Sequence, residues 1–175
     1  MKFTVVDEIP FPLDKVFAAH RDKLPEMVGY MPNIESIEVE SRDEDGDIVR
    51  LVNIWRAAET DVPSVARPFI KPEMLKWTDR ATWDQDEWRC QWNIELGFLP
   101  GAITCRGQNT FEEFDGTTRI TMEGELLIDA AKIPGVPRLM AGSVGGVVEK
   151  FVVKLVEPNL RETNKVVTQY LEKNG

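Results

Sequence analysis

The sequence predicts one α+β domain spanning residues 1–175, in which a curved antiparallel sheet of about six to seven strands wraps around a long C-terminal helix. Two observations predict this class. Short segments of alternating apolar and polar residues recur along most of the chain, and turn residues separate them at short intervals, as in antiparallel neighbours. The last part of the chain instead carries apolar residues at helical spacing, and it is the only segment long enough to cover such a sheet.

The chain begins with an expected strand at Lys2–Ile9, which is rich in β-branched and aromatic residues. Pro12 can open the first turn of a helix over Leu13–Asp22, and a second short helical piece is expected over Pro25–Tyr30. The dipeptide Asp115-Gly116 between alternating segments is a strong hairpin signal. The further strands are expected at Ile34–Glu40, Ile48–Arg56, Leu75–Asp84, Trp88–Leu96, Ala102–Phe114 and Thr117–Ile128.

Two segments depart from the strand pattern. Ala57–Glu73 contains three prolines, so we expect an irregular, lid-like insertion there. The segment from Arg138 to about Lys173 has helical spacing, and Pro158 must kink or restart the helix. Its expected apolar stripe comprises Met140, Val144, Val147, Phe151 and Leu155, continued by Val166, Val167, Tyr170 and Leu171.

Composition excludes several classes of function. The chain is 42% hydrophobic and 29% charged, which argues against disorder. Its formal net charge of −9 is a poor match for nonspecific binding to nucleic acid, where Lys and Arg must neutralise phosphates. We therefore expect no nucleic-acid partner.

The sequence also predicts a cytoplasmic protein without a metal or another cofactor. No segment has the apolar length of a signal peptide or of a membrane span. Cys90 and Cys105 do not form a CxxC pattern, and their offset in the expected hairpin argues against a disulfide. His20 is the only histidine, so a zinc site would need distant cysteines, and we expect this residue at or near the surface.

The element order (a strand, two short helices, about six strands and a long helix) resembles the START-like helix-grip superfamily. That superfamily includes lipid-transfer domains, polyketide cyclases and the birch-pollen allergens. The strand Gly46–Leu51, then Trp55 and then Pro72-Glu73-Met74-Leu75, is similar to the PRELI-like branch. The resemblance implies a single START-like domain with a hydrophobic cavity between sheet and helix, but no one activity.

Tryptophans give the most informative pattern for a site. Within their strands, Trp77, Asp79 and Trp83 share one face, and Trp88 and Trp92 share another. These faces can be ordinary core, or they can be the wall of a cavity for an apolar ligand. The residues expected to bind the ligand are Trp55, Phe69, Trp77, Asp79, Trp83, Trp92, Arg106, Asn109, Ser143, Val147 and Phe151.

Asp79 is the one acidic member of its row. A carboxylate among tryptophans needs a partner or a raised pKa, and Arg50, Asn53 and Arg106 are candidates for that partner. In the other interpretation, which we favour, a bulge or a position at the sheet rim turns Asp79 away from the interior. Nearby, Gly107 and Asn109 are small residues on a face that should fill the interior, so they either leave room for a ligand or mark a point where the helix approaches the sheet closely.

Two segments, 65–71 and 132–140, mix apolar residues with Arg or Lys in an acidic chain. Such segments suit transient contact with a membrane surface. The alternative is a pair of ordinary loops that pack their apolar side inward.

Three functions fit these observations. The first is a module that binds a hydrophobic, lipid-like ligand and can also transport it; this interpretation leans away from an enzyme. The second is an enzyme of the cyclase or hydratase kind, with Asp79 and Arg106 as acid–base and orienting groups. The third is a protein-interaction domain whose interior the five tryptophans fill. The oligomeric state stays open.

Overall fold

The computed structural model describes residues 2–58, 75–97, 101–132 and 161–175. Its strands form one antiparallel sheet of seven strands in the order β1-β7-β6-β5-β4-β3-β2, as predicted. The elements are β1 (Lys2–Ile9), α1 (Leu13–Asp22), η1 (Leu24–Tyr30), β2 (Ile34–Asp45), β3 (Ile48–Ala57), β4 (Lys76–Asp84), β5 (Arg89–Leu96), β6 (Ile103–Phe114), β7 (Thr117–Ile128) and η5 (Ala130–Lys132), and a helix over residues 161–174 follows.

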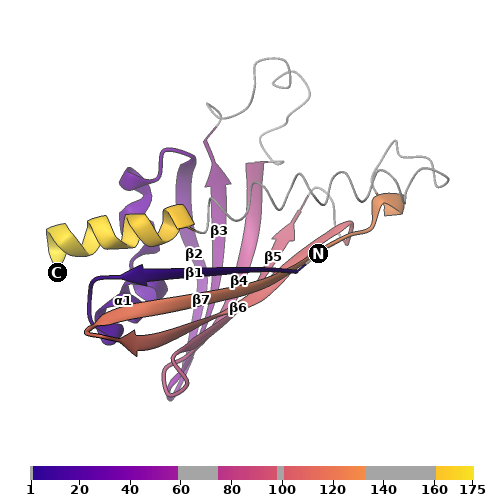
Figure 1. Ribbon diagram of the computed structural model, residues 1–175. Coiled ribbons are helices and arrows are strands. Elements are labelled where there is room, and N and C mark those ends of the chain that lie inside the picture. The colour runs from indigo at the N-terminus through magenta and orange to yellow at the C-terminus, as the bar shows by residue number, and fades with distance from the viewer. Residues whose placement is uncertain (1, 59–74, 98–100, 133–160) are drawn as a thin grey trace.

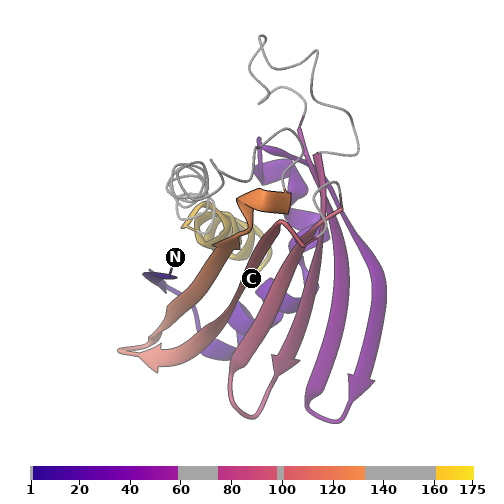
Figure 2. The same cartoon turned by 90° about the vertical axis from the view of Figure 1, so that its right-hand side faces the viewer.

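The sheet is strongly curved, and all the longer helices lie on its concave side (Figures 1 and 2). We call this concave side the inward face and the opposite side the outer face. Side chains alternate between the two faces along each strand. In β7, for example, Thr118, Ile120 and Met122 are buried, whereas the residues between them are partly exposed. One apolar face covered by helices is therefore the basis of the fold.

The hairpin turns have the backbone dihedral angles that tight turns require. Asp115 and Gly116 both have positive φ, 49° and 77°, which is the geometry of a two-residue turn that matches the strand twist. Gly46, between β2 and β3, also has positive φ. Trp88 was expected in a strand but lies in the β4–β5 turn with φ 47°, and its ring still packs inward on Phe17.

The edge strand β2 is five residues longer than the sequence analysis expected, since it continues to Asp45 rather than ending at Glu40. Its register with β3 shifts twice, between Ile34 and Ser36 and between Val39 and Ser41. Ile37 is buried, but Val39, which simple alternation would place on the same face, is 48% exposed. Bulges at the edge of the sheet thus interrupt the simple alternation.

The helix over residues 161–174 packs on the sheet through Val166, Val167 and Leu171, which are all buried. This confirms the C-terminal part of the predicted apolar stripe. The remainder of the expected long helix, including Pro158, lies outside the described residues, as does most of the expected lid-like insertion.

Polar contacts fix the same helix to α1 and β1. His20 Nε2 lies 3.1 Å from Asn164 Oδ1, His20 Nδ1 lies 2.9 Å from the Val16 carbonyl oxygen, and Asn164 Nδ2 donates to Asp7 Oδ2 at 3.3 Å. His20 and Asn164 are 5% and 3% exposed. The expectation of a surface histidine is therefore wrong, because a partner 144 residues away along the chain covers it. Burial lowers the pKa of His20, although its two polar contacts oppose this.

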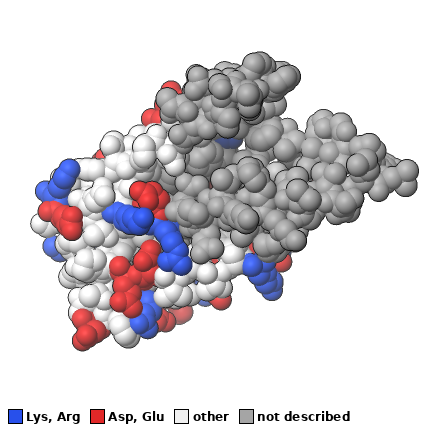
Figure 3. Space-filling model, turned by 45° about the horizontal axis from the view of Figure 1, so that its top comes forward, with Lys and Arg blue, Asp and Glu red and all other residues white. Residues whose placement is uncertain are grey.

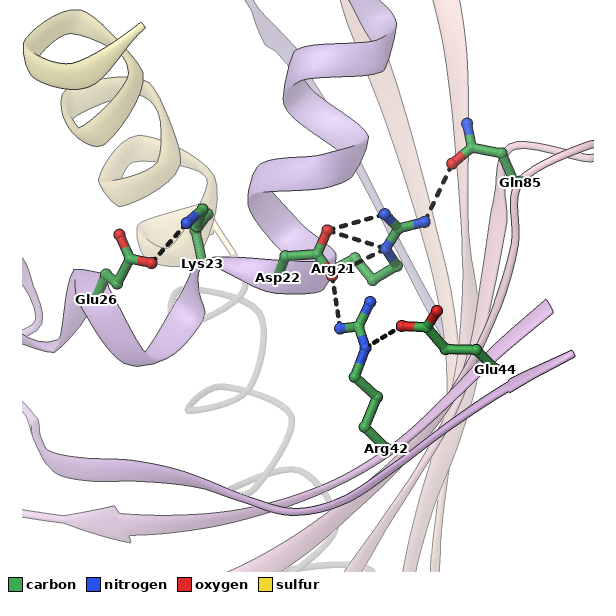
Figure 4. Close-up of polar contacts among 7 residues, drawn as sticks. All are labelled: Arg21, Asp22, Lys23, Glu26, Arg42, Glu44 and Gln85. Atoms are coloured by element: carbon green, nitrogen blue, oxygen red, sulfur yellow. Dashed lines mark hydrogen bonds and ion pairs between the residues drawn. The ribbon is translucent and has the colours of Figure 1, made fainter. Parts of the chain in front are cut away.

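A second polar network ties the end of α1 to two strand hairpins (Figure 4). Asp22 accepts from Arg21 (2.8 Å) and from Arg42 of β2 (2.8 Å), and Arg21 also donates to Gln85 in the β4–β5 turn (3.1 Å). Burial alone would raise the pKa of Asp22, but the two guanidinium groups hold it below its usual value. These contacts fix the orientation of α1 against the sheet.

Cys90 and Cys105 are both buried and free, so the described thiols form no disulfide, as predicted. Burial raises the pKa of Cys105 to about 11, and burial together with the charge of Asp79 raises the pKa of Cys90 well above its usual value. Both thiols therefore stay protonated near neutral pH. Within the described residues, no helix is long and apolar enough to cross a membrane.

Candidate functional site

The candidate site lies on the inward face where β3 and β4 pair. Trp55 lies directly opposite Trp77, and Asn53 lies opposite Asp79. All the pairs along β3 and β4 follow one regular register from Ile48–Asp84 to Arg56–Lys76. The strands therefore bring together two tryptophans, an amide and a carboxyl group on one side of the sheet.

No bulge turns Asp79 outward. Ala81 and Trp83, the next residues on the same face of β4, are buried, and Asn53 opposite Asp79 is only 4% exposed. The favoured interpretation of the sequence analysis, an outward or rim position, is therefore wrong. Alternation along an unbroken strand turns the Asp79 side chain into the interior.

Trp55 and Trp77 form a stacked pair. Their ring centroids lie 5.7 Å apart and the ring planes make an angle of 18°. Both residues are partly exposed, in contrast to the core aromatic residues nearby. Two flat apolar rings at the edge of a buried carboxyl group thus form a surface that an apolar molecule can contact.

Two polar atoms of this group are buried without a hydrogen-bond partner, Asp79 Oδ1 and Trp55 Nε1. One is an acceptor and the other is a donor. A buried polar atom without a partner costs about 1–3 kcal/mol, so each such atom needs an explanation. These two side chains lie close to each other, since Trp55 is near enough to the Asp79 carboxylate to favour its charged form.

Burial raises the pKa of Asp79 from 3.8 to about 6, although the neighbouring Asn53 and Trp55 side chains oppose this by favouring the carboxylate. The Trp55 N–H thus acts on this carboxylate as a weak hydrogen-bond donor, at a geometry outside that of a normal hydrogen bond. Asp79 is therefore largely ionised at neutral pH and becomes protonated in mild acid.

The other predicted tryptophans have different surroundings. Trp83 packs edge-on against Phe17 of α1, with centroids 5.1 Å apart, and its Nε1 is also buried without a partner. Trp92 donates from Nε1 to Asn109 Oδ1 at 2.9 Å, so these two predicted site residues satisfy each other. Trp83 is thus part of the core beside α1, and the Trp92–Asn109 pair is a polar contact within the wall of the sheet.

Position 107 lies beside this pair, and only glycine fits there. A Cβ atom on Gly107 would meet the Glu123 carbonyl oxygen at 2.2 Å and Trp92 Cζ2 at 2.5 Å. Gly124, its partner across the β6–β7 pair, lies under the ring of Phe3, which the Cβ atom would meet at 2.2 Å. Aromatic rings of Trp92 and Phe3 therefore fill the space above the two glycines, and their close packing accounts for the small residues at this position.

Arg106 does not belong to the inward site, which corrects its predicted role as a ligand-binding residue and as a partner of Asp79. It lies on the outer face and donates to Glu125 at 3.0 Å. Arg50, another suggested partner, donates to Asp43 at 3.0 Å on an exposed strand end. Of the three suggested partners, only Asn53 lies beside Asp79.

The outer face has an open depression of about 740 Å³ across β1, β7, β6, β5 and β4. Several polar side chains that line it already pair with one another, such as Arg106 with Glu125 and Gln108 with Glu123. Phe3, Trp92 and the two glycines also belong to the lining. Basic and acidic side chains are similarly interspersed on the described surface in Figure 3. We therefore place the candidate site on the inward face, where polar atoms lack partners.

Four predicted site residues cannot be placed. Phe69, Ser143, Val147 and Phe151 lie outside the described residues, as do the expected membrane-contact segments apart from Lys132. Sequence analysis missed Phe3, Gly124 and Asn164. The alternation of β7 could have indicated Gly124 as a second glycine on the inward face, but no local pattern indicates Asn164.

A family model described as "Protein of unknown function (DUF2505)" matches residues 4–171. The chain belongs to the DUF2505 family. A search of curated proteins found no match. The fold of this DUF2505 protein is the predicted START-like helix grip, and solved structures that are similar to it share that fold.

Three of these structures cover almost the whole chain. Zhui aromatase/cyclase from Streptomyces sp. R1128 is 13% identical with a TM-score of 0.67, over 99% of this chain and 94% of its own. Ara h 8.0201 is 16% identical with a TM-score of 0.68, over 99% of each chain. A START superfamily protein from Mycobacterium smegmatis is 13% identical with a TM-score of 0.57, over 99% of each chain. At these identities the likeness shows the fold alone.

Proposed function

We propose that this DUF2505 protein binds a small apolar molecule, lipid-like in character, between the inward face of its sheet and its C-terminal helix. One observation carries the proposal. The partly exposed Trp55–Trp77 stack lies beside a buried carboxyl group, and two polar atoms of this region lack partners. An apolar wall with a few convergent polar groups is typical of a site for a small molecule.

The energetics support a ligand at this position. Removing apolar surface from water stabilises a complex by roughly 25 cal/mol per Å², and two stacked indole rings offer a large flat area for this. Buried polar atoms without partners lower the stability of the folded protein. A ligand whose polar groups form hydrogen bonds with them would offset this loss. Functional sites are where such local costs persist.

An enzyme is the second candidate, and the pKa of Asp79 is the observation that favours it. A carboxyl group with a pKa of about 6 can both accept and donate a proton near neutral pH. The name of the Zhui aromatase/cyclase gives a reaction class for one protein of this fold. If Asp79→Asn left the turnover of every active substrate intact, the acid–base role of Asp79 would be excluded.

Native mass spectrometry of freshly purified protein, followed by solvent extraction, tests the binding proposal. We expect a discrete added mass that extraction releases as an apolar compound. Bare protein, together with an unchanged melting temperature when a panel of lipids and other apolar compounds is added, would contradict the proposal and favour a packed interaction domain.

The cytoplasmic location, the lack of a nucleic-acid partner and the transient membrane contact stay predictions of the sequence. The membrane prediction depends on segments 65–71 and 132–140, so reversing the charge at Lys71 and Arg138 is its direct test. Loss of co-sedimentation with anionic vesicles is the expected result, since each basic residue near such a surface contributes about 1 kcal/mol.

A further inference from the structure

The depression on the outer face is a second surface of the molecule, on the opposite side of the sheet from the inward site. Its volume of about 740 Å³ lies within the range of about 300–1,000 Å³ that is typical of sites for small molecules. Two neighbouring rows of side chains run across the strands and line it. Opposite one another in β6, β5 and β4, the first row contains Gln108, Gln91 and Thr82, and the second contains Arg106, Asn93 and Arg80.

Several polar groups of this lining face water and are free to bind a ligand. Within the part of the chain that the structure describes, the side chains of Thr82 and Gln91 make no polar contact. Asn93 Nδ2 and Gln108 Nε2 donate to neighbouring carboxylates at 3.1 and 3.0 Å, which leaves both amide oxygens as acceptors. The centre of the depression therefore offers hydrogen-bond donors and acceptors side by side.

The same lining argues against other classes of ligand. An apolar molecule would remove water from amide and charged groups without replacing their hydrogen bonds. A nucleic acid would bring its phosphates against the carboxylates of Glu123 and Glu125. A peptide cannot add to the sheet as a further strand here, because β7, β6 and β5 already have a neighbour on each side.

A saccharide is chemically complementary to this lining. Each of its hydroxyl groups both donates and accepts a hydrogen bond, and a side-chain amide offers one acceptor oxygen and two donor hydrogens. An amide group can therefore bind two neighbouring hydroxyl groups of a sugar at once. Five adjacent strands, spaced about 4.8 Å apart, contribute to the lining, so the depression is long enough for several sugar units.

We infer that the outer depression binds a neutral oligosaccharide, which the side chains of Gln91, Asn93 and Gln108 hold by hydrogen bonds. This inference goes beyond the proposed binding of an apolar molecule and does not depend on it, because the two sites lie on opposite faces of the sheet. The depression is open and wet, so binding is expected to be weak and to exchange water for sugar hydroxyl groups.

The side-chain NH₂ signals of these three residues report on such binding directly in ¹H–¹⁵N NMR spectra of the intact chain. The probes are maltohexaose, laminarihexaose and xylohexaose, each added to about 10 mM so that dissociation constants in the millimolar range are detected. Polyethylene glycol of similar length is the control, because its ether oxygens accept hydrogen bonds but cannot donate them. We expect at least one hexasaccharide to shift all three signals and polyethylene glycol to shift none. No shift with any hexasaccharide, or equal shifts with polyethylene glycol, would overturn the inference.

Two exposed glutamines give a matched comparison. Gln91→Ala removes an amide group from the depression, whereas Gln169→Ala removes one from the helix over residues 161–174. Gln91→Ala should weaken binding of the active hexasaccharide about fivefold, because at least one hydrogen bond is lost. Gln169→Ala should leave the affinity unchanged. Unchanged affinity in Gln91→Ala, or equal losses in both variants, would contradict the assignment of the sugar to the depression.

Discussion

Burial raises the pKa of Asp79 to about 6, so the ionised side chain lowers the stability of the folded protein at neutral pH. The folded state holds the proton more tightly than the unfolded state, whose ordinary value is 3.8. The contribution of Asp79 to stability is therefore fully present below about pH 4 and is lost as the pH rises through about 6. A side chain that destabilises the fold at working pH is more easily explained by a role in binding than by packing.

The replacement Asp79→Asn tests this balance. It keeps the shape of the side chain and removes the ionisation, so we expect the variant to be more stable than the original protein by about 2–3 kcal/mol at neutral pH. The difference should shrink towards zero as the pH falls to about 4. Urea unfolding at a series of pH values measures it. A difference that does not change with pH, or a variant that is less stable at neutral pH, would show that the buried charge is not the cause.

At the scale of elements, the strands and hairpins were predictable because their signals are local. Alternation predicted the bounds of six strands to within two residues, namely β1, β3, β4, β5, β6 and β7. Asp115-Gly116 predicted its turn. The bulges of β2 were not predictable, since they depend on how an edge strand meets its neighbour rather than on its own sequence. The inward direction of Asp79 followed from the same alternation, and only the expected cost of burying a carboxyl group argued against it.

Gly107 and Gly124 allow β6, β7 and the aromatic rings above them to pack closely. We expect Gly107→Ala to lower the free energy of unfolding by about 3 kcal/mol, because the new Cβ atom meets backbone at the Glu123 carbonyl oxygen as well as the Trp92 ring. Gly124→Ala should cost less, since the three atoms nearest to its Cβ position all belong to the Phe3 ring, and that side chain can rotate on an edge strand.

Thermal or urea unfolding compares these two variants with Gly29→Ala, whose Cβ atom would meet nothing within 4 Å. The control should lie within about 0.5 kcal/mol of the original protein. If Gly107→Ala were as mild as Gly29→Ala, then the close approach of β6, β7 and Trp92 would not be a determinant of the fold.

At the scale of the whole molecule, the terminal segments of the chain meet to close the structure. The helix over residues 161–174 joins α1 and β1 through the buried His20–Asn164–Asp7 contacts, and Tyr170 of the same helix donates to Glu26 of η1. Sequence patterns predicted the apolar side of this helix but not its polar partners, because those partners lie more than 140 residues away in sequence. The predicted site was similarly divided. Alternation placed Trp77 and Asp79 on one face of their strand, but only the β3–β4 register shows that Trp55 lies opposite Trp77. Arg106 could be excluded only once its contacts on the outer face were known.

The central claim is that an apolar ligand binds at the Trp55–Asp79 region of the inward face, and the indole N–H signals of the five tryptophans report on it directly. Two-dimensional ¹H–¹⁵N NMR during a titration with naphthol, with each signal assigned by a Trp→Phe variant, is the measurement. We predict a clear shift of the Trp55 signal, because its ring lies in the candidate site, and little change for Trp92, whose N–H is already bonded to Asn109. An unchanged Trp55 signal at saturating naphthol, or shifts confined to residues of the outer face, would contradict the account.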